Sequence, residues 1–133
     1  MKNEPQNPLK RILYVDDDDL SLESIQMLLK NEYTIDTAKT SDEALELAKK
    51  NPYEAVLMDI GLGYDTNGVK LTEEIRKIER YRQIPFIAIT AYASLKDKQF
   101  FLSNGLDYYL AKPFFKKDIL AILDEVFNKS NNE

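Results

Sequence analysis

The sequence predicts an α/β protein with a doubly wound, three-layer fold, in which a five-stranded parallel sheet lies between helices. Five short apolar runs recur along the chain, and each is followed by a longer stretch whose apolar residues have helical spacing. Strict alternation of strand and helix requires right-handed crossovers, which place helices on both faces of a parallel sheet.

The five predicted strands are the apolar runs at residues 12–15, 33–38, 55–58, 86–89 and 108–110. Three of them are almost unbroken hydrophobic runs, which is typical of strands covered on both faces. The second run begins Tyr33-Thr34-Ile35-Asp36 and alternates apolar with polar residues. We therefore expect it to be a half-exposed strand at an edge of the sheet.

Five predicted helices follow these strands. Three have a clear apolar face, formed by Leu22, Ile25 and Leu28/Leu29 in the first, by Leu71, Ile75 and Ile78 in the third, and by Ile119, Ile122/Leu123 and Val126/Phe127 in the last. The second begins with Thr40-Ser41-Asp42-Glu43, a capping-box pattern that binds two free backbone amides. The fourth runs from about residue 94 to 104 and ends at Gly105, which suits the left-handed turn after a helix.

The composition indicates one globular domain. The chain has 133 residues, 44% hydrophobic and 31% charged, which is enough for one core and too little for two. We expect the domain to span residues 10–128, between flexible extensions at 1–9 and 129–133. A net charge of −5 argues against direct binding to nucleic acid or to an anionic membrane. No apolar run approaches the roughly 20 residues of a membrane helix, and the polar start is unlike a signal peptide, so we expect a cytoplasmic protein.

The candidate functional residues stand at strand ends. The chain has no cysteine and no histidine, so its chemistry must use Asp, Glu, Lys, Ser, Thr or Tyr. In a doubly wound sheet the functional loops lie outside the carboxyl ends of the strands. Polar residues follow four of the five predicted strands there, namely Asp16 and Asp17, Asp59, Thr90, and Lys112. Each alone can be a turn residue, a helix cap or a solvated charge, but their recurrence at four strand ends favours one common site.

These residue types suit phosphoryl chemistry. Asp16, Asp17 and Asp59 form a group of hard oxygen ligands of the kind that Mg²⁺ prefers. Lys112 supplies a positive charge and Thr90 a hydroxyl donor, and both suit the oxygens of a phosphoryl group. An aspartate in that setting can act as the nucleophile, because the cation and the lysine neutralise the charge that develops during transfer.

The chain resembles the receiver domain of two-component response regulators, and in particular the chemotaxis regulators. The resemblance rests on ILYVDD, VLMDI, IAITA and YLAKPF, which occur in this order and at the family's usual separations between about residues 11 and 127. It implies a flavodoxin-like sheet in the strand order 2-1-3-4-5 with five helices.

The resemblance also implies roles for individual residues. Asp59 would be the phosphoacceptor and Lys112 would contact the phosphoryl group. Mg²⁺ or Mn²⁺ would be held by Asp16, Asp17, Asp59 and the backbone carbonyl of Gly61. Thr90 and Tyr109 match the family's switch pair, in which the hydroxyl turns toward the phosphoryl group and the aromatic ring moves inward. Lys112-Pro113 would carry a cis peptide bond.

The same resemblance implies partners. The phosphoryl donor would be a sensor histidine kinase or a His-phosphotransfer protein, since this chain has no histidine of its own. An unidentified downstream protein would bind the face made by the fourth helix, the fifth strand and the fifth helix. Phe100 and Phe101 lie on that helix and cannot point the same way, so either one is exposed or both pack partly into the core.

The run of four aspartates divides into two pairs. Asp16 and Asp17 lie at the strand end, where the resemblance places the cation. Asp18 and Asp19 would begin the first helix, because carboxylates stabilise the positive end of the helix dipole and cap its free amides.

The loop after Asp59 departs from the family pattern. Residues 61–68 lack the usual proline, contain three glycines and are one residue longer than usual, which indicates a mobile loop. The side chains two residues after the acceptor and two after Thr90 influence the lifetime of the phosphoryl group in the family, and here they are Gly61 and Tyr92. We therefore expect slow autodephosphorylation.

Two alternative functions are open. A binding-only pseudo-receiver would keep the fold without the chemistry, although all the key residues are present. A magnesium-dependent aspartyl phosphohydrolase of the haloacid type would also use an aspartate at a strand end. Such enzymes have a second aspartate two positions later, where this chain has Gly61, and the chain has no room for a substrate cap.

Overall fold

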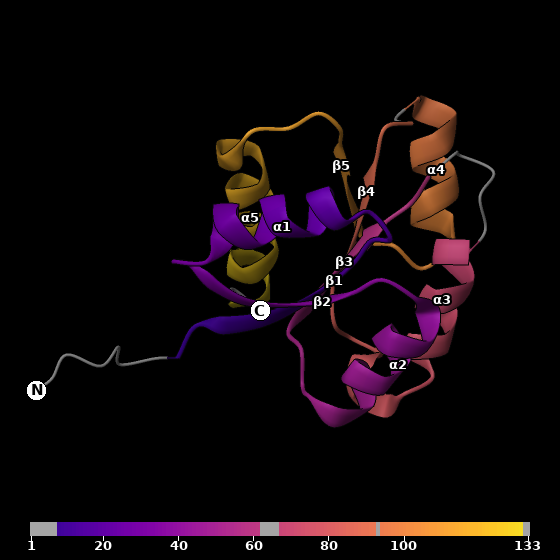
Figure 1. The fold of residues 1–133 in the computed structure, drawn as a ribbon. Helices are drawn as coiled ribbons and strands as arrows, with labels where there is room; N and C mark the ends of the chain where they lie inside the picture. The colour runs from indigo at the N-terminus through magenta and orange to yellow at the C-terminus, as the bar shows by residue number, and fades with distance from the viewer. Residues whose placement is uncertain (1–7, 62–66, 93, 132–133) are drawn as a thin grey trace, which may run out of the picture.

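The computed structural model describes residues 8–61, 67–92 and 94–131. Its elements, in chain order, are β1 (Lys10–Val15), α1 (Asp19–Leu29), β2 (Tyr33–Ala38), α2 (Ser41–Lys50), β3 (Ala55–Asp59), α3 (Asn67–Arg76), the short 3₁₀ helix η1 (Glu79–Tyr81), β4 (Phe86–Thr90), α4 (Leu95–Ser103), β5 (Tyr108–Ala111) and α5 (Lys116–Asn131) (Figure 1). The strand and helix alternation predicted from the sequence is confirmed.

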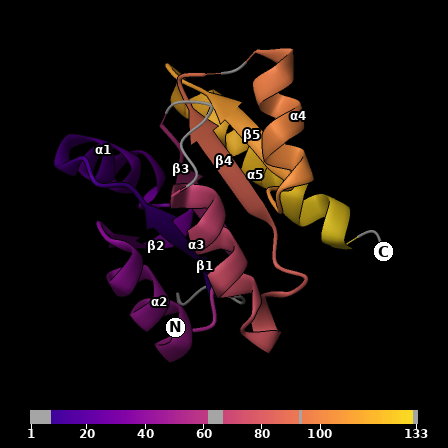
Figure 2. The same ribbon diagram turned by 90° about the vertical axis from the view of Figure 1, so that its right-hand side faces the viewer.

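The five strands form one parallel sheet in the order β2-β1-β3-β4-β5. Apolar residues of α2, α3 and α4 pack on one face of this sheet, and those of α1 and α5 pack on the other. Figure 1 shows the sheet with α1 and α5 on one side and α2, α3 and α4 on the other, and Figure 2 looks onto the face that α2, α3 and α4 cover. This is the predicted three-layer fold, and the strand order implied by the resemblance is confirmed.

Burial along the strands follows from their positions in the sheet. The inner strand β4 is buried throughout, and the central strand β3 is buried up to Met58. Strand β2, which alternates in sequence, lies at one edge and leaves Thr34 exposed. Because a parallel strand in the middle of the sheet is covered on both faces, it needs a continuous apolar run, whereas an edge strand does not.

Side-chain caps define the starts of three helices. The Asp18 carboxylate accepts a hydrogen bond from the Ser21 amide at 3.1 Å, so Asp18 caps α1 and Asp19 is its first residue, as expected. Thr40 caps α2 in the same way, but Glu43 accepts from the amide of Lys39 and not from that of Thr40. In the predicted capping box the Glu43 side chain would accept from the amide of the cap residue Thr40; here it accepts from the amide one residue earlier. A complete capping box is found at Ser94 in α4.

Three further details concern helix ends and aromatic packing. Gly105 has φ of 96°, the left-handed conformation expected after α4. Ile78 is part of the apolar core but lies beyond the end of α3, because the chain turns into η1 there. Phe101 is fully buried and Phe100 is half-buried against the same core, so of the two alternatives the structure shows the one in which both pack inward.

Three further predictions concern the end of the domain, the Lys112-Pro113 bond and membrane-spanning helices. Helix α5 continues to Asn131, beyond residue 128 where we expected the domain to end. The Lys112-Pro113 bond is cis, as the resemblance implied. In the described part of the chain, no helix is sufficiently long and apolar to span a lipid bilayer.

Candidate functional site

The parallel strands bring the predicted site residues to one edge of the sheet. Asp59 is the last residue of β3 and Thr90 the last of β4, while Asp16 and Lys112 directly follow β1 and β5. The register aligns Val15 with Met58, Asp59 with Ile89, and Thr90 with Ala111, so all four strands end at the same level. Residues far apart in sequence therefore meet at the carboxyl ends of the strands.

The closest contact in the site joins Lys112 and Asp59. The Lys112 Nζ lies 2.5 Å from Asp59 Oδ1 and 4.0 Å from Asp16 Oδ2. The hydrogen bond from the Lys112 amide to the Thr90 carbonyl, 2.8 Å, holds the backbone from which this side chain extends. Lys112 thus pairs primarily with Asp59, with Asp16 as a more distant second carboxylate.

The Asp16 carboxylate is buried and held on both oxygens. Its Oδ1 accepts a hydrogen bond from the Asp18 amide at 3.0 Å, and its Oδ2 accepts one from the Tyr14 hydroxyl at 2.6 Å. The residue is only 4% exposed. A buried carboxylate needs such donors, because an unpaired one would be costly to remove from water.

The electrostatic environment of Asp59 contains opposing effects. Burial raises the pKa of Asp59, and the nearby charges of Asp16 and Asp17 raise it further. The hydrogen bond and positive charge of Lys112 act in the opposite direction, but the net effect is a pKa above the ordinary value. Repulsion and desolvation therefore outweigh the lysine, and the site holds an excess of negative charge.

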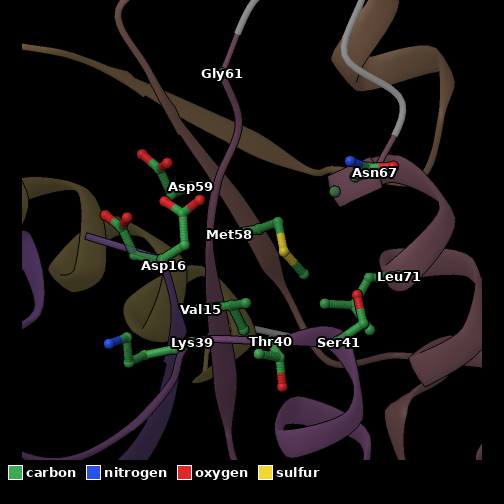
Figure 3. Close-up of a pocket in the computed structure, with 12 residues that line it drawn as sticks. Val15, Asp16, Lys39, Thr40, Ser41, Met58, Asp59, Gly61, Asn67 and Leu71 are labelled. Carbon is green, nitrogen blue, oxygen red and sulfur yellow. The ribbon is translucent and has the colours of Figure 1, made fainter. Parts of the chain in front are cut away.

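A cavity of about 290 Å³ opens beside these carboxylates. Asp16, Asp17, Asp59 and Gly61 are among its lining residues, and Figure 3 shows Asp16, Asp59 and Gly61 in the same part of it. The opposite wall includes Thr40 and Leu71. Of the loop that follows Asp59, residues 62–66 lie outside the described part of the chain, so the expectation of a mobile loop there is not tested.

The negative charge of the site favours a divalent cation more clearly than the present arrangement of its side chains does. Among the described residues, no three acidic, histidine or cysteine side chains converge closely enough to form a ready-made metal cluster. Three carboxylates, those of Asp16, Asp17 and Asp59, nevertheless share the site with the ammonium group of Lys112, while Lys39, which also lines the cavity, is paired with Asp19 at 2.8 Å. A divalent cation would balance this excess, and the exposed Asp17 side chain is free of the packing that holds Asp16.

The two residues of the expected switch pair lie on the same face of the sheet. Thr90 is fully buried, and its hydroxyl lies 3.2 Å from the Gly61 carbonyl and accepts a hydrogen bond from the Tyr92 amide at 3.0 Å. Tyr109 is paired with Ala88, two residues before Thr90, and is half-buried against the core. On that face of β4, Ala88 therefore places only a small side chain beside Tyr109.

Sequence reasoning missed two residues of this region. Tyr14 was counted only as part of an apolar run, although it stands two residues before Asp16 and hence on the same side of the strand. Lys98 was not singled out either, but its Nζ lies 4.6 Å from the centre of the Tyr109 ring. The strand periodicity could have indicated Tyr14, whereas nothing local in the sequence indicates the Lys98 contact.

Comparison with known proteins identifies the family. A model of the response regulator receiver domain matches residues 12–124, so the chain belongs to this family. In sequence it is 35% identical over 113 residues to the signal transduction histidine-protein kinase BarA of Shigella flexneri, a match that covers 84% of this chain and 12% of BarA. The chain spans between 12% and 51% of the length of such curated relatives.

Solved structures agree with this assignment. A CheY-like receiver domain protein from Methanospirillum hungatei JF-1 is 33% identical with a TM-score of 0.80, and the match covers 94% of this chain and 98% of that one. The receiver domain of the sensor histidine kinase PA1611 from Pseudomonas aeruginosa PAO1 is 32% identical with a TM-score of 0.79, covering 91% and 99%. That structure has a magnesium ion coordinated in its active site cleft. The fold and the resemblance to chemotaxis regulators are therefore confirmed.

Proposed function

We propose that this receiver domain is a phosphoacceptor switch of a two-component phosphorelay, with Asp59 as the acceptor. The observation that carries the proposal is the Lys112 ammonium group 2.5 Å from Asp59 Oδ1, in a site that two further carboxylates border. The donor would be the phosphohistidine of a sensor histidine kinase or of a His-phosphotransfer protein. The chain would then catalyse only its own phosphorylation and the later hydrolysis.

The transfer itself requires a nucleophile and a neutralising charge. An Asp59 oxygen forms a bond to phosphorus while the bond between phosphorus and the donor's nitrogen breaks. Lys112 already contacts Asp59 and is placed to pair with the incoming phosphoryl oxygens, which carry more charge than the carboxylate. Thr90 can turn its hydroxyl from the Gly61 carbonyl to a phosphoryl oxygen, because a hydroxyl has one proton to donate.

Mg²⁺ or Mn²⁺ fits the donor set of this site. Asp16, Asp17, Asp59 and the Gly61 carbonyl would hold it, and the ion would neutralise charge on the transferring oxygens when bound. The excess of carboxylates over ammonium groups supports this proposal, as does the magnesium ion in the PA1611 receiver structure.

The output surface would be the face formed by α4, β5 and α5. On α4 the side chains of Leu95 and Leu102 are 70% and 49% exposed, and their spacing of seven residues places them on one side of the helix. Tyr109 lies on β5 beside this helix. Movement of its ring toward Thr90 would change the surface next to these leucines, which supports a readout by a partner protein.

The donor protein would dock on a different surface. An apolar groove of about 540 Å³ runs between α1 and the segment after β5, and Leu20, Leu28, Lys112, Pro113 and Phe114 are among its lining residues. Leu20 is 73% exposed. A protein that brings a phosphohistidine to Asp59 must cover the surface beside Lys112, and this groove offers it apolar contact area there.

Intact-protein mass spectrometry after incubation with acetyl phosphate tests the proposal. We expect a gain of one phosphoryl group in the presence of Mg²⁺, no gain with Asp59→Asn, and an unchanged gain with the control Asp124→Asn, which removes an exposed carboxylate from α5. A wild-type protein that gains no mass at any Mg²⁺ concentration would overturn the proposal and favour the binding-only alternative.

A further inference from the structure

Tyr14 combines a buried position with a polar contact to the candidate site. Its side chain is 1% exposed and packs among the apolar residues between the sheet and α1 and α5. Alternate residues of a strand point to the same face, so Tyr14 and Asp16 lie side by side on β1 and its extension. The Tyr14 hydroxyl donates a hydrogen bond of 2.6 Å to Asp16 Oδ2.

This hydrogen bond occupies the Asp16 oxygen that faces Lys112. Lys112 Nζ is 4.0 Å from the same Oδ2 atom, beyond hydrogen-bond distance, and 2.5 Å from Asp59. The other oxygen of Asp16 accepts from the Asp18 amide. Because both oxygens are held by the protein, the Asp16 carboxylate cannot rotate freely. Lys112 therefore forms its ion pair with Asp59.

A phenylalanine at position 14 would keep the packing of the ring but would lose the hydrogen bond to Asp16 Oδ2. The buried Oδ2 would have no donor within hydrogen-bond distance, because the Asp16 side chain is only 1% exposed and water has little access to it. Lys112 is the nearest remaining cation, so its side chain would be drawn from Asp59 toward Asp16. Both changes disturb the arrangement that receives the cation.

We propose that Tyr14 is a positioning residue of this receiver domain, which orients Asp16 toward the divalent cation and keeps Lys112 on Asp59. The inference rests on the proposed function, since it concerns the same cation site. Hydrogen bonds that orient the ligands of a metal ion typically contribute about 10-fold or more to its affinity.

The test compares cation binding by the full chain and two variants. Titration calorimetry with Mg²⁺, and separately with Mn²⁺, is carried out on the wild type, Tyr14→Phe and Tyr108→Phe. Tyr108→Phe removes the same atom from a half-buried tyrosine of β5 and serves as the matched control. We expect affinity to fall about 10-fold in Tyr14→Phe and to stay at the wild-type value in Tyr108→Phe.

A spectroscopic measurement separates this role from a general loss of structure. The chain has no tryptophan, so its near-ultraviolet absorption reports on tyrosine. We expect Mg²⁺ to produce a tyrosine difference spectrum in the wild type and in Tyr108→Phe, because cation binding changes the charge beside the Tyr14 hydroxyl. The same spectrum should be missing from Tyr14→Phe even at saturating Mg²⁺, where that variant is fully loaded.

The outcomes distinguish the two proposals. Equal or tighter cation binding by Tyr14→Phe, or a difference spectrum that survives in it, would overturn the role of Tyr14 and leave the proposed function intact. A wild-type protein that binds neither Mg²⁺ nor Mn²⁺ would overturn both.

Discussion

Under the proposed function, the residue at position 61 would influence how long Asp59 stays phosphorylated. Hydrolysis of a phosphorylated Asp59 needs a water molecule opposite the oxygen–phosphorus bond, and nearby side chains can orient that water. Gly61 lines the cavity beside Asp59 but has no side chain, and the Tyr92 side chain at the site's rim is partly exposed. The site therefore excludes little water and also orients little of it.

We predict slow autodephosphorylation and a faster reaction in Gly61→Asn. The amide would supply a donor and an acceptor for the attacking water, so the rate of hydrolysis should rise several-fold. Loss of the phosphoryl group is followed by mass spectrometry after removal of acetyl phosphate, in Mg²⁺ buffer. A wild-type protein that loses its label as fast as Gly61→Asn would show that side-chain guidance is not limiting.

At the scale of elements, Arg76 connects the end of α3 to four other segments. Its guanidinium group donates hydrogen bonds to the carbonyls of Tyr81, Arg82, Ile84 and Gly105 and to the Asp107 carboxylate. It also lies 4.2 Å from the centre of the Phe86 ring. These partners belong to η1, the turn before β4, β4 itself and the turn before β5.

Arg76→Lys should destabilise the fold by about 2 kcal/mol, because an ammonium group cannot satisfy several separated acceptors or stack on a ring. Chemical denaturation measures this change. The control is Arg80→Lys, since Arg80 makes one long hydrogen bond of 3.4 Å to Lys49 and is exposed; we expect it to change stability by less than about 0.5 kcal/mol. Equal effects of the two substitutions would contradict the bridging role.

The contact between α4 and β5 provides the second prediction at this scale. Lys98 on α4 lies over the Tyr109 ring and favours its present, half-buried position, by roughly 0.5–1 kcal/mol for a cation–π contact of this kind. A phosphorylated state that moves the ring inward must break this contact. Under the proposed function, Lys98 would therefore bias the domain toward the unphosphorylated state.

Lys98→Met should increase the population of the inward state and speed phosphorylation by acetyl phosphate about 2- to 5-fold. Lys96→Met is the matched control, because Lys96 is an exposed lysine of the same helix. The initial rate of phosphorylation is measured for both. Identical rates for the two variants would show that the ring contact does not bias the switch.

For the whole molecule, the sequence was sufficient for the architecture and for predicting which residues would meet at the carboxyl edge of the sheet. Unbroken apolar runs such as Val56–Met58 can only be central strands, and residues that follow such strands must meet at one edge. The contacts between side chains within the site could not be predicted from the sequence. That Tyr14 binds Asp16 and Lys98 covers Tyr109 depends on side-chain directions and on the distance between elements, which residue types do not encode locally. The hydrogen bond from the Lys39 amide to Glu43 likewise depends on the direction of a side chain.

The excess negative charge of the site makes a prediction about global stability. The pKa of Asp59 is raised in the folded protein, first by burial and then by Asp16 and Asp17, even though Lys112 opposes the change. A carboxyl group whose pKa rises on folding destabilises the folded state when it is ionised. Below the ordinary pKa of about 4 the group is protonated in both states and the penalty disappears. The penalty grows as pH rises through that value and is constant above the folded-state pKa.

Asp59→Asn should therefore raise the melting temperature by a few degrees at pH 7 without divalent cations, and this gain should vanish as the pH approaches about 4. Mg²⁺ should reduce the difference in melting temperature between Asp59→Asn and the wild type at pH 7, because it binds the folded wild type and stabilises it by mass action. Thermal unfolding followed by circular dichroism between pH 4 and pH 7 measures both effects. A lower melting temperature for Asp59→Asn at pH 7 would mean that the attraction of Lys112 exceeds the repulsion and burial that act on Asp59.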